Sequence, residues 1–160
     1  MISTDKNLFD PQSSVSQRQI KLLDQYNRIY IVVFSRNKLT NIKINSRISV
    51  YSTGSRSKWL YIFDAYILSR QLIQANEISN ITCQDPFETG LVGVWLKNKF
   101  NFNLKLELQV HTDPGSPYFG KISILNRLRL LMAKYTLSKA DHVRVVSSRV
   151  KNFVAYFLDS

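Results

Sequence analysis

The stretch from Ile81 to Asp113 decides the fold class, and it reads I-T-C-Q-D-P-F-E-T-G-L-V-G-V-W-L-K-N-K-F-N-F-N-L-K-L-E-L-Q-V-H-T-D. An apolar strand, a helix and a second apolar strand within about thirty residues form one β-α-β unit, in which the two strands are parallel neighbours. In open parallel sheets, ligands bind at the carboxyl ends of the strands. The polar clusters at Asp85–Gly90 and His111–Asp113 fall at those ends. The stretch therefore predicts a parallel sheet and the edge at which it would bind a ligand.

The alternation of strands and helices continues on both sides of this unit. Arg28–Ser35 is a continuous run of β-branched and aromatic residues, which is typical of a strand buried on both faces. Arg47–Ser52 alternates in the way a half-buried strand does. The other expected elements are a strand stub at Met1–Thr4, strands at Ser79–Cys83, Leu104–Val110 and Asp141–Val146, helices at Val15–Gln25, Lys58–Ala75, Phe87–Lys99, Tyr118–Leu137 and Ser148–Leu158, and a loop or weak edge hairpin at Asn37–Ser46. This order predicts an α/β domain with a mostly parallel sheet covered by helices on both faces.

Two of the helices carry apolar residues at helical spacing, which predicts the face that packs on the sheet. These residues are Trp59, Ile62, Phe63, Tyr66 and Ile73 in the first helix, and Tyr118, Ile122, Leu125, Leu128, Met132 and Tyr135 in the second, with Ile124 and Leu131 beside them. On the opposite side of the second helix, Leu130 lies between Arg127 and Lys134. A leucine between two bases suits contact with an anionic lipid surface, although one exposed leucine is common on any helix.

The composition is that of a globular domain with an excess of positive charge. The 160 residues are 44% hydrophobic and 21% charged, and they fit one domain over residues 1–160. The net charge of +11 suggests an anionic partner, such as acidic lipid headgroups or a phosphorylated small molecule, although a basic surface without a partner explains it equally well. Twelve of the 22 bases lie in two long acid-free windows, Asp24 to Asp64 and Asp113 to Asp141, and these windows lack the compact clusters of RNA-binding modules. We therefore expect no nucleic-acid partner.

Cysteine content and hydropathy indicate the compartment. The single Cys83 excludes an internal disulfide and fits a reducing environment, with a buried strand thiol as the simplest interpretation. The sequence shows neither a secretory signal nor an apolar run of ~18–20 residues, the length of a membrane span. We therefore expect a cytoplasmic protein.

Few of the motifs that bind cofactors or carry out catalysis are present. Besides His111 the chain has one further histidine and one cysteine, so we expect no metal site. The sequences typical of serine hydrolases, dinucleotide-binding folds and P-loops are absent, so we expect no cofactor. The turn Thr53–Lys58 could hold a phosphate, but a helix-capping loop is the simpler interpretation. Asp85, Glu88 and Thr89 share one turn, and such groups accept hydrogen bonds from the hydroxyls of a polyol.

Six short runs stand in order along the chain. They are F-D-P-Q-S-S-V at Phe9–Val15, Q-D-P-F-E-T-G at Gln84–Gly90, Q-V-H-T-D at Gln109–Asp113, S-P-Y-F at Ser116–Phe119, N-R-L-R at Asn126–Arg129 and A-D-H-V-R-V-V-S at Ala140–Ser147. As a set they resemble the amino-terminal domain of family 4 glycosyltransferases, which have the GT-B fold. The resemblance covers nearly the whole chain, and the set of motifs in this order is fairly specific.

The resemblance implies a retaining sugar transferase of two Rossmann-like domains, of which this chain is the amino-terminal, acceptor-binding one. The carboxy-terminal domain would hold most of the nucleotide-diphosphate sugar, without a bound metal, and the leaving diphosphate would help to deprotonate the acceptor. His111 would position and stabilise the reacting groups and would not be a nucleophile. The residues that would line the acceptor side are Asp85, Glu88, Thr89, Gly90, Asp113, Asp10 and Ser13. The product would be a cell-surface polysaccharide or a glycolipid made at the inner face of a membrane, on which the protein would be peripheral.

The chain departs from the family in three ways. The first strand is nearly missing, the turn Asp5–Ser14 contains no glycine, and no two glutamates are eight residues apart, as they are in the Glu-x7-Glu pattern of the donor domain. We therefore expect this chain to bind an acceptor but to transfer no sugar alone, with a second chain supplying the donor domain or the reading frame being truncated. The alternative function is a non-catalytic Rossmann-like module that docks on a partner chain.

Overall fold

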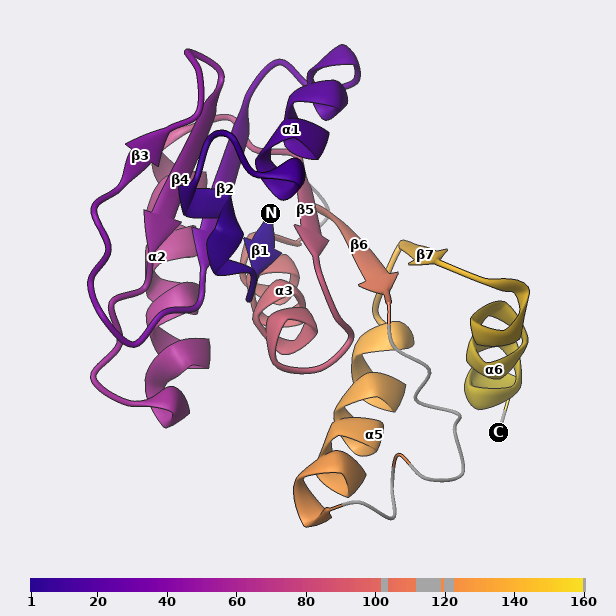
Figure 1. Ribbon diagram of the computed structural model, residues 1–160. Helices are drawn as coiled ribbons and strands as arrows, with labels where there is room; N and C mark the ends of the chain where they lie inside the picture. Colours follow the sequence, from indigo (N-terminus) through magenta and orange to yellow (C-terminus); the bar gives the residue numbers. More distant parts are fainter. Residues whose placement is uncertain (102–103, 112–118, 120–122, 160) are drawn as a thin grey trace. The chain divides into compact units, whose positions relative to one another are not determined.

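The computed structural model describes residues 1–101, 104–111, 119 and 123–159, and the chain forms two compact units, Met1–Glu77 and Ile78–Ser160. Helices alternate with mostly parallel strands in both units, as Figure 1 shows. The α/β class predicted from the sequence is therefore confirmed. Among the described residues, no helix is both long enough and apolar enough to span a bilayer.

In the first unit the strands lie in the order β3-β4-β2-β1. The parallel strands are β1 (Ile2–Ser3), β2 (Ile29–Val33) and β4 (Ile48–Ser52), while β3 (Ile42–Lys43) pairs antiparallel with β4. The predicted strand stub and edge hairpin are thus confirmed. Alternate residues of β2 and β4 pack with Leu8 into a core made of Leu8, Ile29, Ile31, Val33, Ile48 and Val50.

The helices of the first unit begin close to the expected positions. They are η1 (Lys6–Phe9), α1 (Ser14–Lys21), η2 (Leu22–Asp24), η3 (Lys58–Leu60) and α2 (Tyr61–Ala75). The expected serine cap of α1 is Ser13, whose hydroxyl oxygen accepts a hydrogen bond from the Ser16 N–H at 3.1 Å. The predicted helix Val15–Gln25 is divided in the structure, because its last turn tightens into the 3-10 helix η2.

The second unit contains the predicted β-α-β unit. Its strands β5 (Asn80–Cys83), β6 (Lys105–Val110) and β7 (His142–Val145) are all parallel, and its helices are α3 (Glu88–Phe100), α5 (Ile124–Leu137) and α6 (Ser148–Asp159). Cys83 of β5 pairs in register with Leu108 of β6. Gly93 of α3 lies so close to the strands that an added Cβ would come within 2.5 Å of the Cys83 Sγ atom. At this point the backbone of α3 therefore packs directly on a side chain of the sheet.

The predicted packing face of α2 is wrong in part, because Ile62, Tyr66 and Ile73 are half-buried as expected but its other two members are exposed. Trp59, just before this helix, is 84% exposed and Phe63 is 55% exposed, whereas the fully buried positions of α2 are Ala65 and Ser69. The spacing of the apolar residues was helical, but the helix packs through its small residues because these allow close approach to the strands.

The predicted packing face of α5 is also wrong. Its buried residues are Ala133, Thr136 and Leu137, while the large apolar residues are exposed: Ile124 by 77%, Leu125 by 45%, Leu128 by 51%, Leu131 by 68% and Tyr135 by 43%. Thr136 of α5 packs against Gly90 of α3, so small residues again form the contact between the elements. Tyr118 and Ile122, which the prediction placed on the same face, lie outside the described residues.

Candidate functional site

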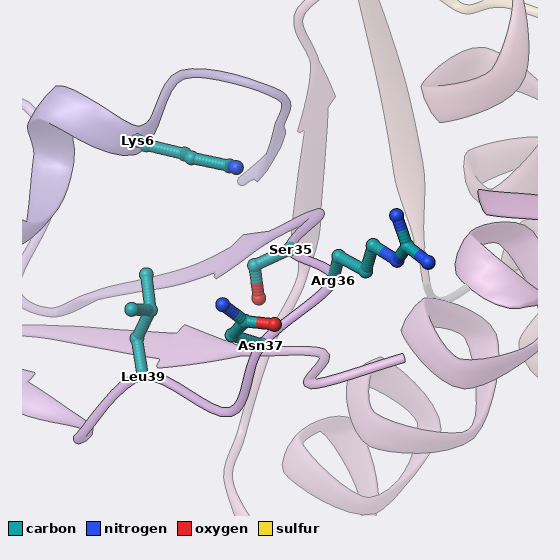
Figure 2. Close-up of a pocket in the computed structure, with 5 residues that line it drawn as sticks. All are labelled: Lys6, Ser35, Arg36, Asn37 and Leu39. Atoms are coloured by element: carbon teal, nitrogen blue, oxygen red, sulfur yellow. The ribbon is translucent and has the colours of Figure 1, made fainter. Parts of the chain in front are cut away.

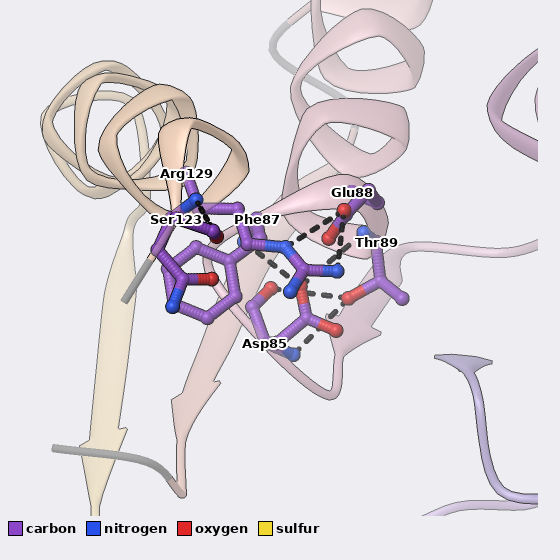
Figure 3. Close-up of polar contacts among 7 residues, drawn as sticks. Asp85, Phe87, Glu88, Thr89, Ser123 and Arg129 are labelled. Atoms are coloured by element: carbon purple, nitrogen blue, oxygen red, sulfur yellow. Dashed lines mark hydrogen bonds and ion pairs between the residues drawn. The ribbon is translucent and has the colours of Figure 1, made fainter. Parts of the chain in front are cut away.

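The turn between β5 and α3 is held closed by Asp85 and Thr89. The Asp85 Oδ1 atom accepts hydrogen bonds from the Phe87 N–H at 2.8 Å and the Thr89 N–H at 3.4 Å. The Thr89 Oγ1 atom accepts from the Asp85 N–H and donates to the Asp85 carbonyl oxygen, both at 3.1 Å. Pro86 lies in this turn, two residues before the first residue of α3, and has no N–H to satisfy. Figure 3 shows how these contacts gather around the helix start.

This arrangement gives three of the predicted acceptor residues a structural role. Thr89 is fully buried, so its hydroxyl serves the turn. Burial raises the pKa of Asp85 above its ordinary value, although the hydrogen bonds from Phe87 and Thr89 oppose the shift. An added Cβ on Gly90 would lie 2.9 Å from the Asp85 carbonyl oxygen, so the turn requires glycine there. These residues shape the edge of the sheet rather than offering free groups to a ligand.

Glu88 is the predicted residue of this turn that retains capacity for a ligand. The Nε atom of Arg129, from α5, donates to the Glu88 Oε1 atom at 2.9 Å, and the Arg129 Nη2 atom forms an ion pair with the same oxygen at 2.8 Å. None of the described residues donates to the Glu88 Oε2 atom, and the Glu88 side chain is 26% exposed. Glu88 therefore presents one carboxylate oxygen that is already oriented by a fixed arginine.

Arg129 is fixed by more than its ion pair. Its guanidinium carbon lies 5.8 Å from the centre of the Phe87 ring, and Phe87 stacks on Phe119 with ring centres 5.7 Å apart. Figure 3 shows Arg129 passing the Phe87 ring to reach Glu88. On the same helix, the Thr136 hydroxyl donates to the Pro86 carbonyl oxygen at 2.6 Å. The N-R-L-R run by itself indicates no role for Arg129, and nothing local in the sequence pairs Arg129 or Thr136 with the turn.

His111 directly follows β6 at the same edge as this turn. Because β5 and β6 are parallel with Cys83 opposite Leu108, the residues after both strands extend from one edge of the sheet. The His111 ring is exposed, and its Nε2 atom lies 2.9 Å from the Gln109 Oε1 atom. An amide oxygen only accepts, so Nε2 carries the proton in this contact. Gln109 thus orients the imidazole, a role that the sequence did not reveal. Asp113 lies outside the described residues.

Asp10 and Ser13, the remaining predicted acceptor residues, belong to the first unit. The Asp10 Oδ1 atom accepts from the Gln12 N–H at 2.9 Å. Ser13 caps α1, and its hydroxyl also donates to the Asn7 carbonyl oxygen at 2.7 Å. These contacts order the turn between η1 and α1.

A pocket of about 480 Å³ opens in the first unit, and no sequence pattern indicated it. It is lined by Lys6, Ser35, Arg36, Asn37 and Leu39, as shown in Figure 2. We call it the Lys6–Arg36 pocket. Two of its five lining residues are cations and none is an acid.

Other groups that could carry chemistry are scarce in the part of the chain that the structure describes. There, no three side chains of histidine, cysteine, aspartate or glutamate come together in a way that could hold a metal ion. Cys83 is buried, as expected, and burial raises the pKa of its thiol well above the ordinary value, which makes it an inert strand thiol.

No family model matches the chain, and no curated protein matches it either. The resemblance to the amino-terminal domain of family 4 glycosyltransferases therefore stays a prediction.

Proposed function

We propose that this chain is the acceptor-binding half of a retaining glycosyltransferase, which moves a sugar from a nucleotide-diphosphate sugar to a glycan or a lipid-linked acceptor. One observation supports the proposal above the others. Glu88, oriented by Arg129 through Oε1, and His111, oriented by Gln109, follow two neighbouring parallel strands at one sheet edge. This is the edge at which open α/β sheets bind ligands.

In this proposal the acceptor sugar binds at the start of α3. The Glu88 Oε2 atom accepts a hydrogen bond from an acceptor hydroxyl, and Arg129 holds the carboxylate in place. Asp85 and Thr89 contribute indirectly because they fix the helix start that carries Glu88. Asp113 belongs to the same acceptor side by the resemblance to family 4.

His111 acts by position and charge, not as a nucleophile. The ring is exposed and is oriented by Gln109, so it is positioned to act where charge develops during transfer. A second domain, on the same protein or on a partner chain, holds the nucleotide sugar. The leaving diphosphate takes the proton of the acceptor hydroxyl, so the reaction as proposed requires no metal.

The exposed face of α5 supports a membrane location for the acceptor. Ile124 and Leu131 are seven residues apart and share one side of the helix, and Arg127 and Lys134, also seven apart, border that side. The helix Ile124–Leu137 contains no acid. Apolar side chains bordered by bases are typical of helices that lie in the interface of an anionic bilayer. We therefore place the protein on the cytoplasmic face of a membrane, in the synthesis of a cell-surface polysaccharide or glycolipid.

The test is a transfer assay on the whole gene product, alone and mixed with chains that carry a Glu-x7-Glu donor domain. Labelled nucleotide sugars and lipid-linked acceptors are supplied, and the labelled product is measured. His111→Ala should lower the rate by ~10²-fold or more, as the loss of one positioned polar group in an active site does. His142→Ala, an exposed histidine on β7, is the matched control and should leave the rate unchanged. Equal rates for His111→Ala and the unaltered protein would remove His111 from the site.

The second candidate function is a non-catalytic module that docks on a partner chain. It is favoured by the apolar side chains exposed on and next to α2, namely Trp59, Phe63 and Ile67, which are 84%, 55% and 53% exposed. Apolar patches of this kind mark interaction sites. In the transfer assay, a stable complex with the donor-domain chain but no product with any sugar would select this function.

A further inference from the structure

The Lys6–Arg36 pocket lies at the carboxyl ends of two parallel strands in the first unit. Ser3 of β1 pairs in register with Val33 of β2. Lys6 follows Ser3 by three residues and Arg36 follows Val33 by three residues. The register of β1 on β2 therefore brings two cations from distant parts of the sequence to the same edge of the sheet.

The two cations are not neutralised by the protein. None of the described residues forms an ion pair with Lys6 or Arg36, and both side chains are exposed. The nearest acid in sequence, Asp5, uses its carboxylate to accept from the Asn7 N–H at 2.9 Å. Further bases follow the parallel strands at this edge: Lys38 after β2, and Arg56 and Lys58 after β4. The pocket therefore has a positive potential that favours an anion.

The loop that forms one wall of the pocket is held firmly in place. The Ser35 carbonyl oxygen accepts from the Thr53 hydroxyl at 3.1 Å and from the Ser55 N–H at 2.9 Å. The Ser52 hydroxyl donates to the Asn37 carbonyl oxygen at 3.2 Å and accepts from the Leu39 N–H at 3.1 Å. These bonds from the end of β4 order the loop before any ligand arrives, which reduces the entropy lost on binding.

We propose that the Lys6–Arg36 pocket binds a phosphate or diphosphate group. The Lys6 ammonium, the Arg36 guanidinium and the Asn37 amide supply donors that suit phosphate oxygens (Figure 2). A volume of about 480 Å³ lies within the range of small-molecule sites and holds a diphosphate with an attached group. Under the proposed function, on which this step rests, the pocket makes one substrate of the transferase a phosphate-bearing molecule.

The proposal is tested by titrating the ¹⁵N-labelled protein with inorganic pyrophosphate at constant ionic strength and following its amide signals by NMR. The expected result is saturable shifts of the amide signals at residues 35–39. Lys6→Gln combined with Arg36→Gln should weaken binding at least tenfold, since each hydrogen bond to a charged group contributes about 1.5–3 kcal/mol. The matched control is Arg28→Gln combined with Lys43→Gln, which removes the same charge from exposed positions away from the pocket and should bind as the unaltered protein does. Lys6→Arg with Arg36→Lys keeps the charges and should retain most of the binding.

Two further titrations separate the sources of the phosphate. A short-chain alkyl phosphate represents a lipid-linked acceptor, and a hexose 1-phosphate represents a soluble one. Tighter binding of either compound at residues 35–39 supports the site and identifies the source of the phosphate group. The absence of saturable shifts at these residues, or an equal loss of binding in the control variant, would overturn the proposal. This titration needs no sugar transfer, so its failure leaves the proposed function standing. Conversely, intact phosphate binding without transfer would reject the proposed function alone.

Discussion

The hydrogen bonds of Asp85 allow a test that separates its geometry from its charge. Asp85→Ala removes the acceptor of the Phe87 and Thr89 N–H groups at the start of α3, and Phe87 is buried. Losing a helix cap costs typically ~1 kcal/mol, and leaving a buried donor unsatisfied costs 1–3 kcal/mol, so we expect a loss of about 2 kcal/mol in the free energy of unfolding. Asp85→Asn keeps an acceptor oxygen in the same place and should cost less than half as much.

The pH dependence gives the sign of the charge effect. Because burial raises the pKa of Asp85, the folded protein binds this proton more tightly than the unfolded chain does. The stabilisation from this group is fully present below the ordinary pKa of 3.8 and is lost as the pH rises through the folded value. The asparagine variant has no such titration. Its stability relative to the unaltered protein should therefore improve as the pH rises from about 4 to about 7.

The measurement is urea unfolding followed by tryptophan fluorescence across this pH range, for the unaltered protein and both variants. The reasoning is refuted if Asp85→Asn is as destabilising as Asp85→Ala, because the oxygen acceptor would then not matter. It is equally refuted if the difference between the asparagine variant and the unaltered protein does not change with pH.

Two other results are expected from the packing of the helices in the second unit. Gly93→Ala should lower the free energy of unfolding by about 1–2 kcal/mol, because overpacking against the Cys83 thiol outweighs the higher helix propensity of alanine. Unchanged or higher stability of this variant would contradict the close packing of α3 on the sheet. The double variant Leu128→Glu with Leu131→Glu on α5 should abolish co-sedimentation with vesicles of anionic phospholipid. The control, Gln71→Glu with Gln74→Glu on α2, adds the same charge without removing apolar surface and should still sediment with the vesicles. Equal sedimentation of both variants would contradict the membrane role of α5.

The sequence predicted the elements well where the deciding interactions are local. The β-branched run of β2, the serine cap of α1 and the β5-α3-β6 unit all follow from neighbouring residues. It failed for the packing face of α5 and for the exposed part of the face predicted for α2. A periodicity of large apolar residues cannot show that a helix will pack through Ala133 and Thr136, because that choice depends on the glycine at position 90 of another helix.

The sequence predicted where the candidate site residues lie along the strands and helices, but it did not predict the contacts that their side chains make. The polar turn after β5 and the histidine after β6 could be placed from the alternation of strands and helices. The pairing of Glu88 with Arg129 joins residues 41 apart in sequence, and the role of Gln109 depends on side-chain direction. The Lys6–Arg36 pocket depends on the register of β1 on β2, which nothing in either segment specifies by itself.

The central claim is that this chain provides the acceptor side of a retaining sugar transferase. The most direct measurement is the anomeric configuration of the product, determined by NMR, when the whole gene product and a donor-domain chain act on a nucleotide sugar and a lipid-linked acceptor. We expect a product whose new glycosidic bond keeps the configuration of the donor, and we expect His111→Ala to lower the rate at which it forms. Inversion of the configuration, or no product with any nucleotide sugar, would contradict it.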